Sequence, residues 1–134
     1  MRILLDTNVF ISGIFFSGPP SQILKAWKDT KIQIVLSKEI LTEYQRVGEV
    51  LSAKYSEIDI VPIIDLLTIY GEVVETKDIS VSICEDPDDN KFIECAIAGN
   101  CRLIVSGDKH LLNISGFQQI EVLKPREFID IHLK

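Results

Sequence analysis

Two aspartates stand directly after short apolar runs that have the character of buried strands. Asp6 follows the run at residues 3–5, and Asp108 follows residues 103–105 in the segment Ser106-Gly107-Asp108. In a parallel sheet the carboxyl ends of the strands meet at one edge, and ligands bind there. We therefore expect the two carboxylates to face a common crevice, although aspartate is also a residue type that caps turns and helices.

Three more aspartates, Asp86, Asp88 and Asp89, crowd the start of a predicted helix. One acid would be enough to cap that helix and to complement its dipole. Three carboxylates so close in sequence repel one another unless a cation lies among them. We therefore predict that at least one of them binds a metal ion, with Asp89 as the first choice and Asp86 as the alternative.

Glu43 is the fourth candidate acid, and it lies within a predicted helix. The apolar stripe of that helix consists of Ile40, Tyr44, Val47 and Leu51. On a helical wheel Glu43 falls beside this stripe, at the boundary between the buried and the exposed face. It can therefore reach over the edge of the sheet. A role as an ordinary surface acid fits the same position, and Glu39 and Glu49 compete for the functional role.

Carboxylates gathered in this way suit Mg²⁺ or Mn²⁺, because hard divalent cations prefer oxygen ligands. Such an ion lowers the pKa of a bound water and stabilises negative charge as a phosphodiester is attacked. The serines at positions 12, 17 and 106 lack an evident base partner for a nucleophilic mechanism. The acids therefore predict metal-dependent hydrolysis of a phosphodiester.

The elements that must position these acids alternate between strand and helix. Apolar runs predict strands at residues 3–5, 32–36, 72–76, 103–105 and 120–123. Capping residues and helical spacing predict six helices. They begin at Pro19 or Pro20 and after Ser37, run over residues 57–70, include Phe92, and begin at Leu111 and at Pro125. Gly71 is expected to end the third of these in the left-handed conformation. The alternation predicts one α/β domain over residues 1–134, with helices on both faces of a central, mostly parallel sheet.

Composition narrows the class of protein. The chain of 134 residues is 46% hydrophobic, which is enough for a full core. Its net charge of −6 counts against a dedicated nucleic-acid-binding module, but metal ions held by acids would cancel part of that charge. The three cysteines and two histidines lack the spacing of a zinc site. No signal peptide or membrane segment is evident, so we expect a cytoplasmic protein without a membrane partner.

The acidic motifs, taken in order, resemble those of the PIN-domain ribonucleases. The first predicted strand ends in Asp6-Thr7-Asn8, which is similar to the opening of these nucleases. The segment Leu41-Thr42-Glu43-Tyr44 is similar to the one that carries the family's helical glutamate. Residues 86–96 resemble the third acidic motif and residues 103–108 the fourth, so the resemblance covers nearly the whole chain.

This resemblance implies a PIN-like three-layer α/β/α fold and a ribonuclease that uses Mg²⁺ or Mn²⁺. The acidic site that it implies consists of Asp6, Glu43, Asp89 and Asp108. Asn8 and Ser106 would position these ligands or hold water. Many members carry a further acid after the position of Asp108, where this chain has Leu111 and Leu112.

The resemblance also implies partners. These are an RNA substrate, a small antitoxin protein that inhibits the nuclease as the toxin of a toxin–antitoxin module, and a second copy in a homodimer. Basic residues near the acidic motifs are candidates for phosphate contacts, although each of them, taken singly, is better explained as a solvated surface charge. They are Lys38, Arg46, Lys91, Lys109 and His110.

Other classes with acids at strand ends fit less well. A phosphatase of the haloacid-dehalogenase type needs a second aspartate two residues after the first, where this chain has Asn8. A receiver domain needs paired acids at its first strand, and only Asp6 is present there. A flap nuclease for DNA uses extra helical elements for which the chain is too short. The alternative that stays open is a PIN-fold binding or scaffold module with weak catalysis.

Overall fold

The computed structural model describes residues 1–134, and its centre is a five-stranded sheet in which all neighbouring strands are parallel. The strands are β1 (Arg2–Leu5), β2 (Gln33–Ser37), β3 (Glu72–Val74), β4 (Leu103–Val105) and β5 (Glu121–Leu123). They lie in the order β3-β2-β1-β4-β5. The five predicted strands and the parallel sheet are confirmed, with small shifts of the strand ends.

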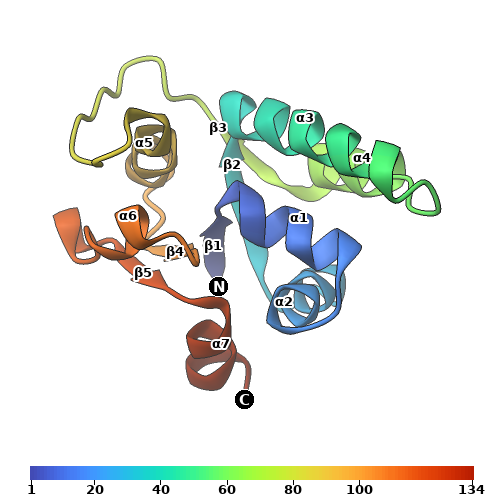
Figure 1. Ribbon diagram of the computed structural model, residues 1–134. Coiled ribbons are helices and arrows are strands. Elements are labelled where there is room, and N and C mark those ends of the chain that lie inside the picture. The colour runs from blue at the N-terminus through green and yellow to red at the C-terminus, as the bar shows by residue number, and fades with distance from the viewer.

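Helices cover both faces of this sheet. They are α1 (Thr7–Phe15), α2 (Pro19–Lys28), α3 (Lys38–Lys54), α4 (Val61–Tyr70), α5 (Asn90–Ala98), α6 (Lys109–Leu112) and α7 (Pro125–Phe128). Helices α1 to α4 lie on one side of the strands and α5 and α6 on the other, as right-handed crossovers require for this strand order (Figure 1). The fold is therefore the predicted three-layer α/β/α arrangement. No helix has the length and apolar character needed to cross a bilayer.

The order of the strands creates a crevice beside β1. The chain runs from β1 outward to β2 and β3, and then returns across the sheet to β4 and β5. The order of the strands reverses between β1 and β4. The segments that follow these two strands therefore diverge, and they leave a gap at the carboxyl ends of the strands. Asp6 follows β1 and Asp108 follows β4 by three residues, so both acids stand at this crevice.

Helix α3 is attached to the end of β1 by Tyr44, a large residue with a polar group that lies in the core. Ser37 begins the helix, because its hydroxyl oxygen accepts a hydrogen bond from the backbone N–H of Ile40 at 3.2 Å. The ring of Tyr44 is fully buried and stacks on Phe10, with ring centroids 4.2 Å apart. Its hydroxyl donates to the backbone oxygen of Leu5. Core packing therefore sets the position of the neighbouring Glu43.

The third predicted helix is present as α4, but its predicted start and the predicted conformation of the glycine after it are wrong. The helix expected over residues 57–70 begins at Val61, whose backbone N–H donates to the side chain of Asp59 at 3.0 Å. Gly71 ends it with φ −71° and ψ 153°, an extended conformation, because the chain continues directly into β3. A side chain at Gly71 would meet the oxygen of Leu67 at 2.5 Å, so close packing explains this glycine.

Helix α1 was missed by the sequence reasoning. Its residues are mostly β-branched or aromatic, types that favour strands when judged alone. The cap supplied by Asp6 and the burial of the helix against α2 and α3 decide the outcome. Local propensity is overridden here by tertiary packing.

We expect Tyr44→Phe to lower the free energy of unfolding by about 1–2 kcal/mol, because a buried carbonyl would lose its hydrogen-bond donor. Urea denaturation followed by circular dichroism measures the effect. Tyr70→Phe is the matched control, since Tyr70 is 63% exposed, and it should change stability by less than about 0.5 kcal/mol. Equal stabilities for the two variants would show that the Tyr44 hydroxyl does not anchor α3.

Candidate active site

A pocket of about 150 Å³ lies at the carboxyl edge of the sheet and is lined mainly by acids. Four separate parts of the chain supply these acids: the end of β1, helix α3, the turn before α5 and the loop after β4. They are Asp6, Glu43, Asp88, Asp89 and Asp108. The structure thus brings together the four acids that the sequence singled out, and it adds Asp88.

Asp6 is held in place by two uncharged donors. Its side chain is 4% exposed, and Oδ1 accepts a hydrogen bond from the backbone N–H of Val9 at 2.9 Å, which caps α1. Oδ2 accepts from the hydroxyl of Ser106. Burial raises the pKa of Asp6, and these hydrogen bonds offset the rise only in part.

Ser106 connects Asp6 to the second strand-end acid. Its hydroxyl donates to Asp6, and its oxygen accepts from the backbone N–H of Asp108 at 2.9 Å. Asp108 in turn caps α6, because its Oδ1 accepts from the N–H of His110 at 2.9 Å. One fully buried serine therefore sets the spacing of two carboxylates that come from different strands.

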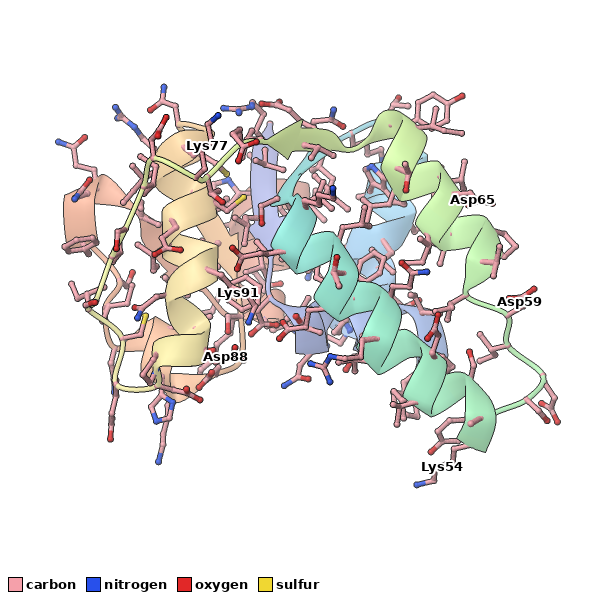
Figure 2. All side chains as sticks on the ribbon, turned by 90° about the horizontal axis from the view of Figure 1, so that it is seen from above. Lys54, Asp59, Asp65, Lys77, Asp88 and Lys91 are labelled. Carbon is pink, nitrogen blue, oxygen red and sulfur yellow. The ribbon has the colours of Figure 1, made fainter.

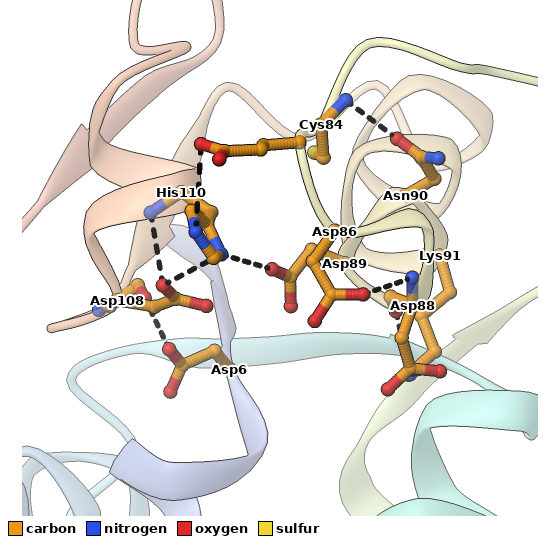
Figure 3. A network of polar contacts seen from close by, with 11 residues as sticks. Asp6, Cys84, Asp86, Asp88, Asp89, Asn90, Lys91, Asp108 and His110 are labelled. Atoms are coloured by element: carbon orange, nitrogen blue, oxygen red, sulfur yellow. Dashed lines mark hydrogen bonds and ion pairs between the residues drawn. The ribbon is translucent and has the colours of Figure 1, made fainter.

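Asp89 has a buried oxygen without a hydrogen-bond partner. It stands at the start of α5 but makes no capping bond, and its Oδ2 is enclosed and unpaired. Figure 3 shows the ring of His110 between Asp89 and Asp108, with Nδ1 3.7 Å from Oδ2 of the first and 3.7 Å from Oδ1 of the second. Burial and the charge of Asp108 raise the pKa of Asp89 to about 6.

This part of the pocket fits a divalent cation. An unpaired, buried carboxylate oxygen is costly unless a positive charge or a donor satisfies it. Asp86, Asp89 and His110 can each place one ligand atom within 4.8 Å of the others. Asp86 lies at the exposed rim, where its Oδ1 caps the turn by accepting from the N–H of Asp88 at 3.0 Å.

A largely enclosed ammonium group lies beside two of the pocket's acids, Glu43 and Asp88, and lines the adjoining groove rather than the pocket itself. Lys91 Nζ lies 2.9 Å from Glu43 Oε1 and 3.0 Å from Asp88 Oδ1, and its side chain is 11% exposed. The other oxygen of Glu43 accepts from the hydroxyl of Thr7. Burial acts to lower the pKa of Lys91, but the hydrogen bonds to Glu43 and Asp88 outweigh it, so the pKa is raised.

The segment between β3 and α5 is tied to the helix that follows it. Asn90 is buried, and its Oδ1 accepts from the backbone N–H groups of Ile83 at 3.3 Å and Cys84 at 2.9 Å. Glu94 accepts from the N–H of Val81 at 2.9 Å. The earlier part of the segment, with its turn at Lys77 and Asp78, is exposed. The positions of Asp86 to Asp89 therefore depend on α5.

A larger cavity of about 740 Å³ lies at the amino ends of β1 and β2 and is lined by residues such as Met1, Trp27, Lys31 and Tyr70. No acid lines it, so it offers no carboxylate to a metal ion. The chemistry expected from the sequence belongs to the smaller acidic pocket.

Comparison with known proteins agrees with this arrangement. Residues 2–110 match the family model described as the PIN domain. The chain belongs to the PIN-domain family. It is 31% identical over 144 residues to the uncharacterized protein MJ1680 of Methanocaldococcus jannaschii, an alignment that covers 97% of this chain and 90% of that protein. No solved structure matches the chain significantly.

Within this PIN domain, the remaining candidate residues differ in their positions. Asn8 is exposed at the edge of the acidic pocket, and Ser106 is buried beneath it. Glu39 and Glu49, the competitors of Glu43, line other surface depressions. Arg46 is 68% exposed and Lys109 is exposed as well, whereas Lys91 is largely enclosed beside the pocket, where it pairs with Glu43.

Sequence reasoning did not single out Thr7 and Asn90 as residues that hold the site together. Both are buried polar residues. Thr7 binds a partner that is distant in the sequence, and Asn90 binds the preceding loop. The signal available for Thr7 was a hydroxyl residue between a buried strand and an apolar run. Its partner Glu43 could not be read from that signal, because the contact forms only when α3 packs on α1.

We expect Asp89→Asn to stabilise the metal-free PIN domain at pH 8, by about 1 kcal/mol after allowance for solvent screening. The pKa of Asp89 is raised from its ordinary 3.8 to about 6, so its favourable protonated form is lost as the pH rises through that range. Urea denaturation in EDTA at pH 4 and pH 8 measures the difference, which should vanish near pH 4.

Asp65→Asn, on the exposed face of α4, provides the control and should give the same small change at both pH values. A pH-independent effect of Asp89→Asn would contradict the view that ionised Asp89 destabilises the empty pocket.

Proposed function

We propose that the protein is a metal-dependent endoribonuclease that hydrolyses RNA phosphodiester bonds with Mg²⁺ or Mn²⁺. The observation that carries the proposal is the enclosed, unpaired Oδ2 of Asp89, which faces Asp108 and His110 in a pocket that also contains Asp6. A site built only for structure would satisfy that oxygen with a donor from the protein. Membership of the PIN-domain family supports the same activity.

Asp6, Asp89 and Asp108 would hold the metal ion from within the pocket, with Asp86 and His110 as further ligands whose atoms lie within 4.8 Å of that of Asp89. When bound, the ion supplies an activated water and stabilises the charge that develops on the phosphate. Ser106 orients the carboxylate of Asp6 by donating to it, and Thr7 orients Glu43 in the same way. These residues keep the acids in position without adding a competing positive charge.

RNA would approach along the polar groove beside the pocket. This groove has a volume of about 440 Å³, and Lys38 and Arg46 from α3 line it together with Glu43. Arg46 and Lys109 are exposed enough to contact phosphates, although Arg46 Nη2 also lies 3.8 Å from Glu43 Oε1. Exposed cations position a nucleic acid without reading its bases. The exposed amide of Asn8 can hold a water or a phosphate oxygen at the edge of the pocket.

We expect purified protein to cleave RNA only when Mg²⁺ or Mn²⁺ is present, and Asp6→Asn to lower the rate by roughly 100-fold or more, the scale of losing one major transition-state contact. A panel of single-stranded and hairpin RNAs, incubated with metal or with EDTA and resolved on a denaturing gel, measures this. The variant should remain folded, because asparagine also caps helices.

Asp65→Asn is the matched control for the loss of one carboxylate and should cleave at the wild-type rate. Cleavage that persists in EDTA, or that survives Asp6→Asn, would count against the proposal. A protein that binds Mn²⁺ in calorimetry yet cleaves none of the RNAs would favour the binding-module alternative.

We further propose that the nuclease acts as the toxin of a toxin–antitoxin module, as a homodimer that a small antitoxin protein inhibits. The outer face of α4 supports contact with another protein, because Val61, Ile69 and Tyr70 are each more than half exposed on one helix. The resemblance of the acidic motifs to those of such toxins supports the biological role.

Induced expression of the wild-type chain in a bacterial host is expected to arrest growth, because cleavage of cellular RNA would stop protein synthesis. Asp6→Asn, expressed to the same soluble level, is expected to permit growth. Colony counts after induction measure the difference. Normal growth with active, soluble wild-type protein would rule out the role as a general toxin and leave the ribonuclease proposal in place.

A further inference from the structure

We propose that Lys91 is a built-in cation that takes the place of a second divalent metal ion, so that this pocket binds one metal ion. The inference rests on the proposed function, since it concerns how the same site holds its metal. It also gives Lys91 a task different from the phosphate contact that its sequence position suggested.

The ammonium group of Lys91 uses all three of its N–H donors inside the protein. Its partners are Glu43 Oε1 at 2.9 Å, Asp88 Oδ1 at 3.0 Å and the backbone oxygen of Asp88 at 2.8 Å. Figure 2 shows Lys91 and Asp88 near the beginning of α5, on the side of that helix that faces α3. A lysine held by three acceptors has no donor left for a phosphate.

The pocket is therefore divided into two halves with different partners. In one half, Asp6 and Asp108 accept hydrogen bonds from uncharged donors, and Oδ2 of Asp89 accepts none. No lysine or arginine pairs with these carboxylates, and their basic neighbour is His110, with Nδ1 3.7 Å from Asp89 and from Asp108. In the other half, Glu43 and Asp88 share the positive charge of Lys91.

A second divalent cation would have to bind beside that ammonium group. The two positive charges would repel each other strongly in a partly enclosed pocket, where water screens them poorly. The ammonium also occupies the acceptors that such an ion would need. Lys91 thus offsets one of the two negative charges of Glu43 and Asp88 and leaves the metal ion to the half formed by Asp6, Asp89 and Asp108.

Lys91 is held by groups of the protein. Asp88 lies one helical turn before it, and Glu43 approaches from α3. The ion pair therefore joins α3 to α5 beside the pocket and fixes the position of Glu43. This makes Lys91 a positioning residue.

The number of bound Mn²⁺ ions tests the inference without RNA. Titration with Mn²⁺, followed by the electron paramagnetic resonance signal of the free ion, is expected to give one ion per wild-type chain. Lys91→Gln removes the cation and is expected to give two. Lys91→Arg keeps the charge and is expected to give one, as is Lys109→Gln, which removes an exposed lysine outside the pocket.

The double variant Glu43→Gln with Lys91→Gln removes the carboxylate as well as the cation, and it is expected to bind one ion. It shows whether the second ion in Lys91→Gln depends on the charge of Glu43 and does not result from a change in folding. A second measurement needs only the wild-type protein. At saturating Mn²⁺ its bound-ion spectrum should be that of an isolated ion, whereas two neighbouring ions would give a coupled spectrum.

Two ions in the wild-type protein, or a coupled spectrum, would overturn the inference and leave the metal-dependent nuclease intact. So would one ion of unchanged affinity in folded Lys91→Gln. No bound Mn²⁺ in the wild-type protein would instead overturn the proposed function, and this inference with it. A purely structural role for Lys91 would alter stability and leave the number of ions unchanged.

Discussion

Mutual repulsion among carboxylates at the carboxyl edge of β1 and β4 is the constraint to which the surrounding structure responds. Each strand-end acid is held by a cap or a hydroxyl: Asp6 by Val9 and Ser106, and Asp108 by the N–H of His110. Burial first, and then the charges of the neighbouring carboxylates, raise the pKa values of Asp6 and Asp89. The acids stay close together at a cost in folding free energy, because the sheet sets their positions and core packing stabilises the sheet independently of them.

Core and site are joined at two adjacent residues of α3. Tyr44 points into the core, where it stacks on Phe10 and binds the end of β1, while Glu43 faces the pocket. The depth at which the tyrosine packs therefore decides whether the carboxylate meets Thr7 and Lys91. A helical wheel places Glu43 only at the boundary between the buried and exposed faces. The anchoring of its neighbour Tyr44 is what directs Glu43 into the pocket.

The sequence is most informative where a local pattern has one physical explanation. Runs such as residues 103–105 predict strands buried on both faces, and an acid after such a strand must lie at the carboxyl edge of a parallel sheet. The contact between Glu43 and Lys91 could not be predicted, because it depends on how closely α3 and α5 approach over that edge. Gly71 was misread for a similar reason: its conformation follows from the strand that comes next, and close packing explains the glycine.

The attachment of residues 81–84 to Asn90 and Glu94 has a consequence for how this chain can change in length. Helix α5 fixes the positions of the acids that precede it. A change in the exposed turn at Lys77 and Asp78 therefore need not move those acids. Lengthening such a turn costs only the entropy of a larger loop, about 0.6 kcal/mol for each doubling. Insertions can therefore accumulate there in evolution, and a designed tag or docking peptide can be grafted there, while the acids keep their register.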